Sequence, residues 1–260
     1  MSNFCRTSDR SNSVVVGKEF CSNEDIKKIS FTGSTHVGKM LMKQSSDTVK
    51  RVSLGECNTF VLCECGPYFA ISHFLLIITL ELGGNAAFIV FEDANLETAI
   101  DAAVASKFRN AGQTCVCADR FLVHESIYNE FVEKFVDAVN KLKVGDGMDG
   151  DTSVGPLITE DALLSVDEKV KEALKEGANL LTGGKVIESP GNFFEPTILG
   201  EVNRKSRIWN METFGPVAAI SQFSDDDDAI STANDTRYGL GIISIFILTY
   251  AFRHFTVLVL

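Results

Sequence analysis

Short strand-like runs alternate with amphipathic helical runs along most of the chain, and this alternation constrains the fold more than any other feature. Residues 88–91 (FIVF) are wholly apolar, as in a strand that is buried on both faces of a parallel sheet. Asp93 or Asn95 can cap a helix that we expect from Leu96 to about Phe108. Further strands are expected at 27–31, 50–54, 120–124, 194–199 and 217–223, and further helices from 37, at 126–143, at 160–175 and from 227 to 234. The pattern predicts an α/β layer fold with parallel strands.

Two apolar stretches, 55–80 and 242–260, do not follow this alternation. Their cleanest apolar runs, 69–80 and 242–252, are shorter than the roughly 20 residues that a membrane-spanning helix needs. We therefore interpret both stretches as segments foreign to the fold and do not expect a membrane protein. A membrane-associated protein that uses these two stretches is the alternative.

The charge balance and the cysteine content exclude several classes of protein. The formal net charge of −11 argues against nucleic-acid binding, because phosphates need a basic surface. The chain has seven cysteines, an odd number, and its polar N-terminus shows no signal-peptide pattern. We therefore expect free thiols and no disulfide framework. Cys115 and Cys117, like Cys63 and Cys65, are too close in sequence for a structural zinc site, and we expect no metal.

The first of three local motifs is the turn at residues 31–38 (FTGSTHVG), where a strand runs through a glycine into a helix. Free N–H groups and the helix dipole at such a turn favour a phosphate. Gly33 lets the backbone come close to a ligand, and Ser34 can cap the helix or bond a phosphate oxygen. A purely structural turn is the alternative.

The second and third motifs carry a carboxylate and a thiol. Glu81 precedes two glycines beside a buried strand, where a raised pKa would suit a general base. Cys115 follows a helix end in a loop near Arg109, where a reactive thiolate could form. The alternatives are a surface glutamate at a turn and an inert buried cysteine.

Taken in order, the turn at 31–38, residues 81–84 (ELGG) and residues 112–115 (GQTC) resemble the NAD(P)-dependent aldehyde dehydrogenase superfamily. Residues 106–125 are most similar to succinate-semialdehyde dehydrogenase. Three further stretches also resemble the family, at 153–157 (SVGPL), 192–197 (NFFEPT) and 212–217 (ETFGPV).

The resemblance covers roughly residues 30–54 and 81–241 and implies an aldehyde-dehydrogenase-like α/β fold. Residues 1–81 would be the remnant of an NAD-binding domain, and residues 82–241 most of a three-layer α/β catalytic domain. Excising the apolar insertion 55–80 joins Leu54 to Glu81 as the family has it, which suggests translated intron; sequencing the transcript across this region tests that reading. Residues 242–260 would be a foreign apolar tail.

The resemblance also implies roles for single residues. Cys115 would be the nucleophile that attacks the aldehyde, and Glu81 the general base that activates water. Arg109 would pair with the far carboxylate of the substrate, a geometry that suits a guanidinium; a salt bridge at the helix end is the alternative. Cys117 would form a redox-sensitive disulfide with Cys115.

The implied cofactor is NAD, with NADP as the alternative. The residues that would bind it are Gly33, Ser34, Thr35, Val37 and Gly38 in the turn, and Leu82, Glu212 and Phe214 elsewhere. The implied reaction is oxidation of a small aldehyde, succinic semialdehyde by subfamily, to its acid.

The chain also departs from the family. We do not find the family's Pro-Trp-Asn segment, its adenosine-ribose lysine, a further substrate-binding serine or its C-terminal oligomerisation strand. We therefore expect little or no activity from this chain alone, and no family-type homo-oligomer. The alternatives are a non-catalytic truncated product or another aldehyde dehydrogenase subfamily. Family resemblance implies a mitochondrial location, with the cytoplasm as the alternative.

Overall fold

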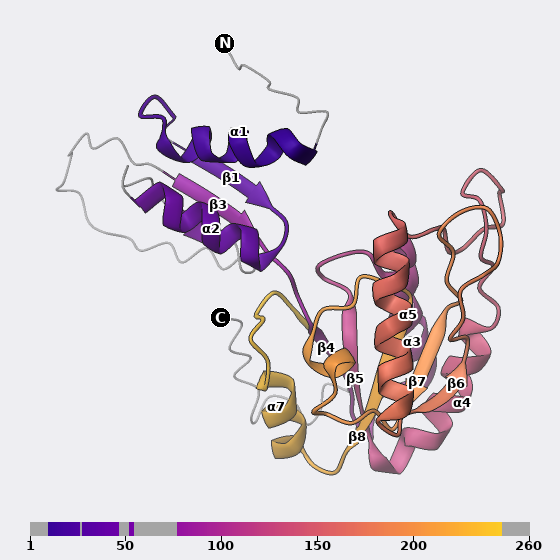
Figure 1. Cartoon of the computed structure of the whole chain (residues 1–260). Helices are drawn as coiled ribbons and strands as arrows, with labels where there is room; N and C mark the ends of the chain where they lie inside the picture. Colours follow the sequence, from indigo (N-terminus) through magenta and orange to yellow (C-terminus); the bar gives the residue numbers. More distant parts are fainter. Residues whose placement is uncertain (1–9, 27, 47–51, 55–76, 246–260) are drawn as a thin grey trace. The chain divides into compact units, whose positions relative to one another are not determined.

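The computed structural model describes residues 10–26, 28–46, 52–54 and 77–245, which divide between two units, Met1–Gly83 and Gly84–Leu260 (Figure 1). We describe each unit by itself. The first holds α1 (Arg10–Ser22), β1 (Lys28–Thr32), α2 (Thr35–Ser45), β2 (Val52–Leu54) and β3 (Ile77–Glu81). Its three strands are parallel in the order β1-β3-β2.

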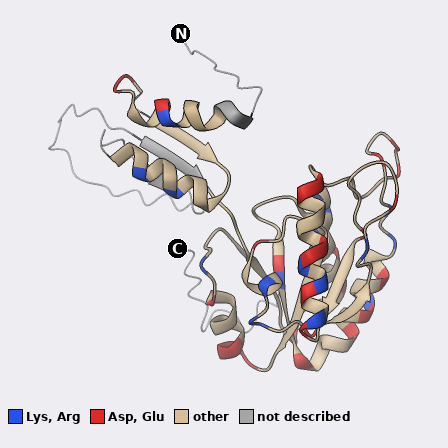
Figure 2. Ribbon diagram, in the orientation of Figure 1, with Lys and Arg blue, Asp and Glu red and all other residues tan. Residues whose placement is uncertain are grey.

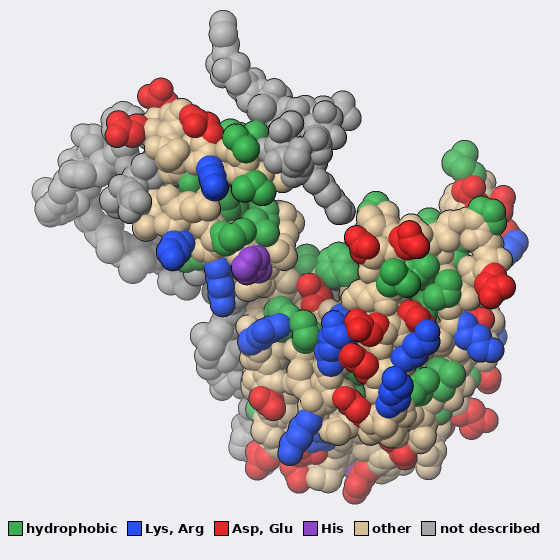
Figure 3. All heavy atoms as spheres, viewed as in Figure 1, with side chains coloured by type: hydrophobic (Ala, Val, Ile, Leu, Met, Phe, Trp, Pro, Cys, Tyr) green, Lys and Arg blue, Asp and Glu red, His purple; other side chains and the backbone are tan. Residues whose placement is uncertain are grey.

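The first unit has a small core. Cys21 and Ile29 are its fully buried hydrophobic residues within the described ranges. Val14 and Val15 on α1 are 61% and 66% exposed, and Figure 3 shows apolar side chains on the surface of this unit.

Strand β3 corrects the expectation for residues 55–80. The last four residues of that stretch, 77–80, form β3 together with Glu81, at the centre of the sheet. Leu54 is paired with Leu80, so Leu54 and Glu81 lie on neighbouring strands and not at the end of one strand. Two physical reasons account for this pairing. Residues 78–80 (ITL) have the same strand-forming pattern as residues 52–54 (VSL). Two parallel neighbouring strands also need a long connection between them, and the chain between Leu54 and Ile77 is long enough to provide it. Residues 55–76 lie outside the described ranges.

The second unit is built on a six-stranded sheet in the order β6-β7-β8-β5-β4-β9. All neighbours are parallel except β6 and β7. The strands are β4 (Ala86–Val90), β5 (Ala118–His124), β6 (Asn179–Thr182), β7 (Thr197–Gly200), β8 (Val217–Phe223) and β9 (Ile242–Ile245). The helices are α3 (Leu96–Phe108), α4 (Tyr128–Val139), α5 (Glu160–Lys175), α6 (Arg207–Asn210) and α7 (Asp226–Asn234), with short 3-10 helices η2 (Arg109–Gly112) and η3 (Glu125–Ile127). The predicted α/β fold is confirmed.

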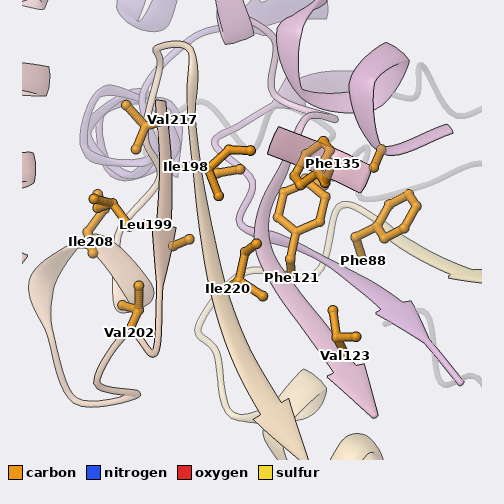
Figure 4. Close-up of a cluster of buried hydrophobic side chains, with 14 of the residues drawn as sticks. Phe88, Phe121, Val123, Phe135, Ile198, Leu199, Val202, Ile208, Val217 and Ile220 are labelled. Carbon is orange, nitrogen blue, oxygen red and sulfur yellow. The ribbon is translucent and has the colours of Figure 1, made fainter. Parts of the chain in front are cut away.

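The core of this unit lies on the sheet and is rich in aromatic and branched side chains (Figure 4). Phe88 and Phe121 stack across β4 and β5 with ring centroids 5.1 Å apart, and Phe135 of α4 lies 5.5 Å from Phe121. All five residues of β4 are buried, as the apolar run at 88–91 predicts for a central strand.

Strand β9 corrects the expectation that residues 242–260 lie outside the fold. Its four residues pair in parallel with β4, from Ala87 opposite Ile242 to Val90 opposite Ile245. A β-branched apolar run is suited to the open edge of β4, which explains the pairing. Residues 246–260 lie outside the described ranges. Within those ranges, no helix is long and apolar enough to cross a membrane.

Lys and Arg residues are interspersed with Asp and Glu residues along the second unit (Figure 2). Arg204 and Asp228 form one bidentate pair there, with Nη1 2.6 Å from Oδ1 and Nη2 3.0 Å from Oδ2. The hydrogen bonds from Arg204 hold the pKa of Asp228 below its ordinary value.

This pair should make stability depend on pH. Because the folded-state pKa of Asp228 is lowered, its contribution is present above the unfolded pKa of about 3.9 and is lost as pH falls through the folded value. Asp228→Asn should flatten the unfolding free energy in that acidic window and cost about 1 kcal/mol or less at neutral pH. Urea unfolding from pH 2 to 7 measures this dependence. The exposed Asp227→Asn is the control, and equal profiles for both variants would contradict the prediction.

Candidate active site

The loop that carries Cys115 begins with an unusual turn at the end of α3. Asn110 and Ala111 both have φ of 53°, and Gly112 follows with φ of 70°. A non-glycine residue in this left-handed region costs about 1–3 kcal/mol, and such residues cluster at functional sites. The turn sends the chain from α3 into the loop at 113–117 and leaves Arg109 exposed.

Gln113 fastens this loop to the stretch at 153–158. Its Nε2 donates to the carbonyl oxygens of Asn110, at 3.2 Å, and Pro156, at 3.3 Å. Its Oε1 accepts from the Ile158 amide at 2.9 Å. The sequence motif contained this glutamine but gave no sign of its role, because its partners Pro156 and Ile158 lie more than forty residues away.

The two cysteines of the loop differ in exposure. Cys115 is half-buried, whereas Cys117 is 4% exposed and its Sγ lies 2.7 Å from Thr114 Oγ1. Both are free thiols. The redox disulfide between them stays a prediction.

Three sequence motifs meet at Cys115 within the second unit. A Cβ on Gly84 would lie 2.1 Å from the Cys115 carbonyl oxygen, and one on Gly112 would lie 2.1 Å from the Gly215 carbonyl oxygen. The Gly84 amide donates to Glu212 Oε1 at 2.8 Å. The backbones of the ELGG, cysteine-loop and ETFGP segments are therefore in direct contact, at positions where only glycine fits.

Glu212 is half-buried, and burial raises the pKa of its carboxyl group. The hydrogen bond from Gly84 and the charges of Lys169 and Lys107 oppose this, whereas Asp119 adds to it. Phe214, the other predicted cofactor residue of this segment, is 42% exposed. A half-buried carboxylate of this kind could accept hydrogen bonds from the hydroxyl groups of a ribose.

A buried polar cluster lies behind Glu212, and sequence reasoning missed it. Lys107 Nζ is 2.7 Å from Asp119 Oδ1, with side-chain exposures of 0% and 3%. Thr213 donates its amide to Asp119 Oδ2 at 3.0 Å and accepts from Lys107 at its carbonyl oxygen. Lys169 also contacts Thr213, and it was the one sign of this cluster in the sequence. It falls on the buried stripe of α5, where a lysine needs a partner.

Arg120 holds the backbone of Asn85, the residue that follows Gly84. Its guanidinium is buried and donates to the carbonyl oxygens of Asn85, Thr232 and Ala233. Burial lowers the pKa of Arg120 to about 10.

The predicted phosphate turn lies in the first unit. Ser34 caps α2 by accepting from the Val37 amide, and the Gly38 amide donates to the Ser34 carbonyl oxygen. This helix start, which also includes Thr35, fits a pyrophosphate by its chemistry. Glu81 ends β3 opposite Thr32, and Leu82 follows it and packs on the small core of this unit.

The structure thus brings Cys115, Gly84 and Glu212 together, and the roles of all the predicted site residues stay predictions. Within the described ranges, no cluster of His, Cys, Asp or Glu could hold a metal ion.

Comparison with known proteins defines the class of protein. The model of the aldehyde dehydrogenase family matches residues 10–61 and 70–245, so the chain belongs to this family and the predicted resemblance is confirmed. The match omits residues 62–69, which are part of the stretch 55–80 that was expected to be an insertion.

The relatives include semialdehyde dehydrogenases. A succinate-semialdehyde dehydrogenase [NADP(+)] of Escherichia coli is 46% identical over 225 residues, which are 86% of this chain and 41% of the relative. The mitochondrial succinate-semialdehyde dehydrogenase of Mus musculus is 44% identical over 86% of this chain and 38% of its own length. A glutarate-semialdehyde dehydrogenase of Pseudomonas putida is 44% identical, again over 86% of this chain and 41% of the relative.

A crystal structure of an NADP-dependent enzyme of E. coli matches with a TM-score of 0.81 and 43% identity, over 93% of this chain and 45% of that one. The chain spans about two fifths of the length of the curated relatives that it matches.

Proposed function

We propose that this protein takes part in the NAD(P)-dependent oxidation of an aldehyde to a carboxylic acid, with succinic semialdehyde as the substrate. The observation that carries the proposal is the meeting of the Cys115 loop with Gly84 and the Glu212 segment. Family membership supports the reaction, and relatives named for succinate semialdehyde support the substrate.

Cys115 is the proposed nucleophile. Its thiolate attacks the carbonyl carbon of the aldehyde and forms a thiohemiacetal. A nicotinamide cofactor held by the turn at 33–38 and by Glu212 would supply the hydride acceptor, so that the adduct on Cys115 could become a thioester. Glu81, as general base, takes a proton from water, which attacks the thioester and releases the acid with the thiol restored.

The proposed cofactor residues come from separate segments of the sequence. The turn from Gly33 to Gly38 would hold the pyrophosphate, and Glu212 would accept hydrogen bonds from the nicotinamide ribose with Phe214 beside it. NAD is the proposed cofactor and NADP the alternative; titration with NADH and NADPH separates them. A mitochondrial location is proposed from the mouse and rice relatives.

Arg109 is the proposed ligand of the far carboxylate of succinic semialdehyde, because its exposed guanidinium precedes the cysteine loop. Succinic semialdehyde should therefore protect Cys115 from iodoacetamide at lower concentration than butanal, which lacks the carboxylate. Arg109→Met should raise the protecting concentration of succinic semialdehyde about 10- to 100-fold, since a charged hydrogen bond contributes about 1.5–3 kcal/mol. The protecting concentration of butanal should not change.

Arg109→Lys is the matched control for charge, since it keeps the cation and loses the bidentate fork. Equal protection by both aldehydes in the unmodified chain would reject the carboxylate-bearing substrate. Stronger protection by glutaric semialdehyde would favour the alternative substrate that one relative's name suggests.

A further inference from the structure

Lys169 is a buried lysine that the proposed reaction does not use. It lies on α5 and is 6% exposed. Its Nζ donates to the Glu212 carbonyl oxygen at 2.5 Å and to Thr213 Oγ1 at 3.5 Å. The ammonium group therefore binds the backbone of the residue whose carboxylate holds Gly84.

We propose that Lys169 is a positioning residue for the cysteine loop, acting through the Glu212 carboxylate and the Gly84 amide. The inference rests on the proposed function only in taking Cys115 as the reacting thiol. The chain of contacts is short: Lys169 holds the Glu212 backbone, Glu212 Oε1 holds the Gly84 amide at 2.8 Å, and Gly84 lies directly against the Cys115 carbonyl oxygen.

The other side of this segment is held by the Lys107–Asp119 pair. Asp119 accepts from the Thr213 amide, and Lys107 donates to the Thr213 carbonyl oxygen at 3.3 Å. Glu212 and Thr213 are thus held from α3, β5 and α5 at once. A segment without regular secondary structure needs such contacts to keep one backbone position.

Charged groups face Glu212 from several elements. Lys107 and Lys169 lie near Asp119 and Glu212, while Arg120 of β5 acts on Asp119 and Arg207 of α6 acts on Lys169. Removing the Lys169 charge takes away positive charge that favours the ionised form of Glu212, so protonation of Glu212 becomes easier. A protonated Glu212 is a weaker acceptor for the Gly84 amide.

Hydrogen exchange of the Gly84 amide in the full chain tests this directly, without aldehyde or cofactor. Lys169→Met should lower the protection factor of Gly84 about tenfold or more, because the charge-assisted hydrogen bond from the Gly84 amide to Glu212 is weakened. Lys169→Arg, which keeps a donor and its charge, should retain most of the protection. Lys171→Met, which removes an exposed lysine paired with Asp167 on the same helix, should change nothing.

The pH profile separates positioning from a merely structural role. Gly84 protection should fall as pH drops through the pKa of Glu212, and this step should move to higher pH in Lys169→Met and vanish in Glu212→Gln. The core amide of Leu122 reports folding in every variant. Unchanged Gly84 protection in Lys169→Met would overturn the proposal.

The Glu212→Gln variant keeps the proposal testable if Lys169→Met fails to fold. If the pH-dependent step in Gly84 protection survives in Glu212→Gln, the proposal is overturned. Because the readout needs no substrate, its failure leaves the aldehyde chemistry untouched. A lack of aldehyde protection at Cys115 would reject the proposed function alone.

Discussion

Lys107→Met is expected to lower the unfolding free energy of the second unit by about 3–5 kcal/mol, because it leaves a buried carboxylate without its partner. Asp119 is 3% exposed, and its contact with Lys107 Nζ is 2.7 Å. Methionine fills the volume of the lysine stem but neutralises no charge. Trp209, the single tryptophan of the chain, is 2% exposed and reports unfolding in denaturant by its fluorescence.

Two further variants show whether the effect comes from the buried charge. Lys134→Met removes an exposed lysine, 3.1 Å from Glu130, and should cost at most about 1 kcal/mol. Lys107→Met combined with Asp119→Asn should recover part of the loss, since the amide oxygen can still accept from Thr213 and no charge remains unpaired. A Lys107→Met variant as stable as Lys134→Met would show that the pair is not buried as described.

The second large effect is expected at Gly112. Alanine there must adopt a φ of 70° and place its Cβ 2.1 Å from the Gly215 carbonyl oxygen, which is backbone and cannot simply rotate away. Strain and overpacking each contribute about 1–3 kcal/mol, so Gly112→Ala should lose about 3 kcal/mol or more. Denaturant unfolding followed by Trp209 fluorescence again measures the loss.

Two other glycines provide matched controls. Gly177 has φ of 99° with open space at its Cβ position, so Gly177→Ala isolates the backbone strain, at about 1 kcal/mol. Gly155 has open space and no positive φ, so Gly155→Ala should change stability by less than about 0.5 kcal/mol. If Gly112→Ala were no more destabilising than Gly177→Ala, the cysteine loop and the Gly215 segment would not be in contact.

Much of the fold could be predicted because its elements have strong local patterns. The apolar run at 88–91, the Asn95 cap and the stripe of α5 depend on neighbours in sequence. The role of residues 77–80 and of β9 could not be predicted in this way. A short apolar run pairs with whichever strand edge is open to it, and that edge is made by distant residues.

The candidate site also has a part that local sequence patterns predict and a part that depends on contacts between distant residues. Cys115 stands in a motif with chemical meaning, and the family resemblance added Glu212, so both were candidates before the structure was known. The contacts of Gly84 with Cys115 and Glu212 link residues up to 128 positions apart, and no local pattern reports them. The Lys107–Asp119 pair was missed because a lysine and an aspartate 12 residues apart are ordinary in sequence and informative only once both are buried.

The most direct test of the central claim, an assembled cysteine site, is alkylation of the full chain by iodoacetamide at neutral pH with peptide mapping of all seven cysteines. The account predicts fast, selective modification of the half-buried Cys115 and slow modification of the buried Cys117 and Cys21. Equal, slow modification of every cysteine would contradict it and show that the thiol is not activated in this chain.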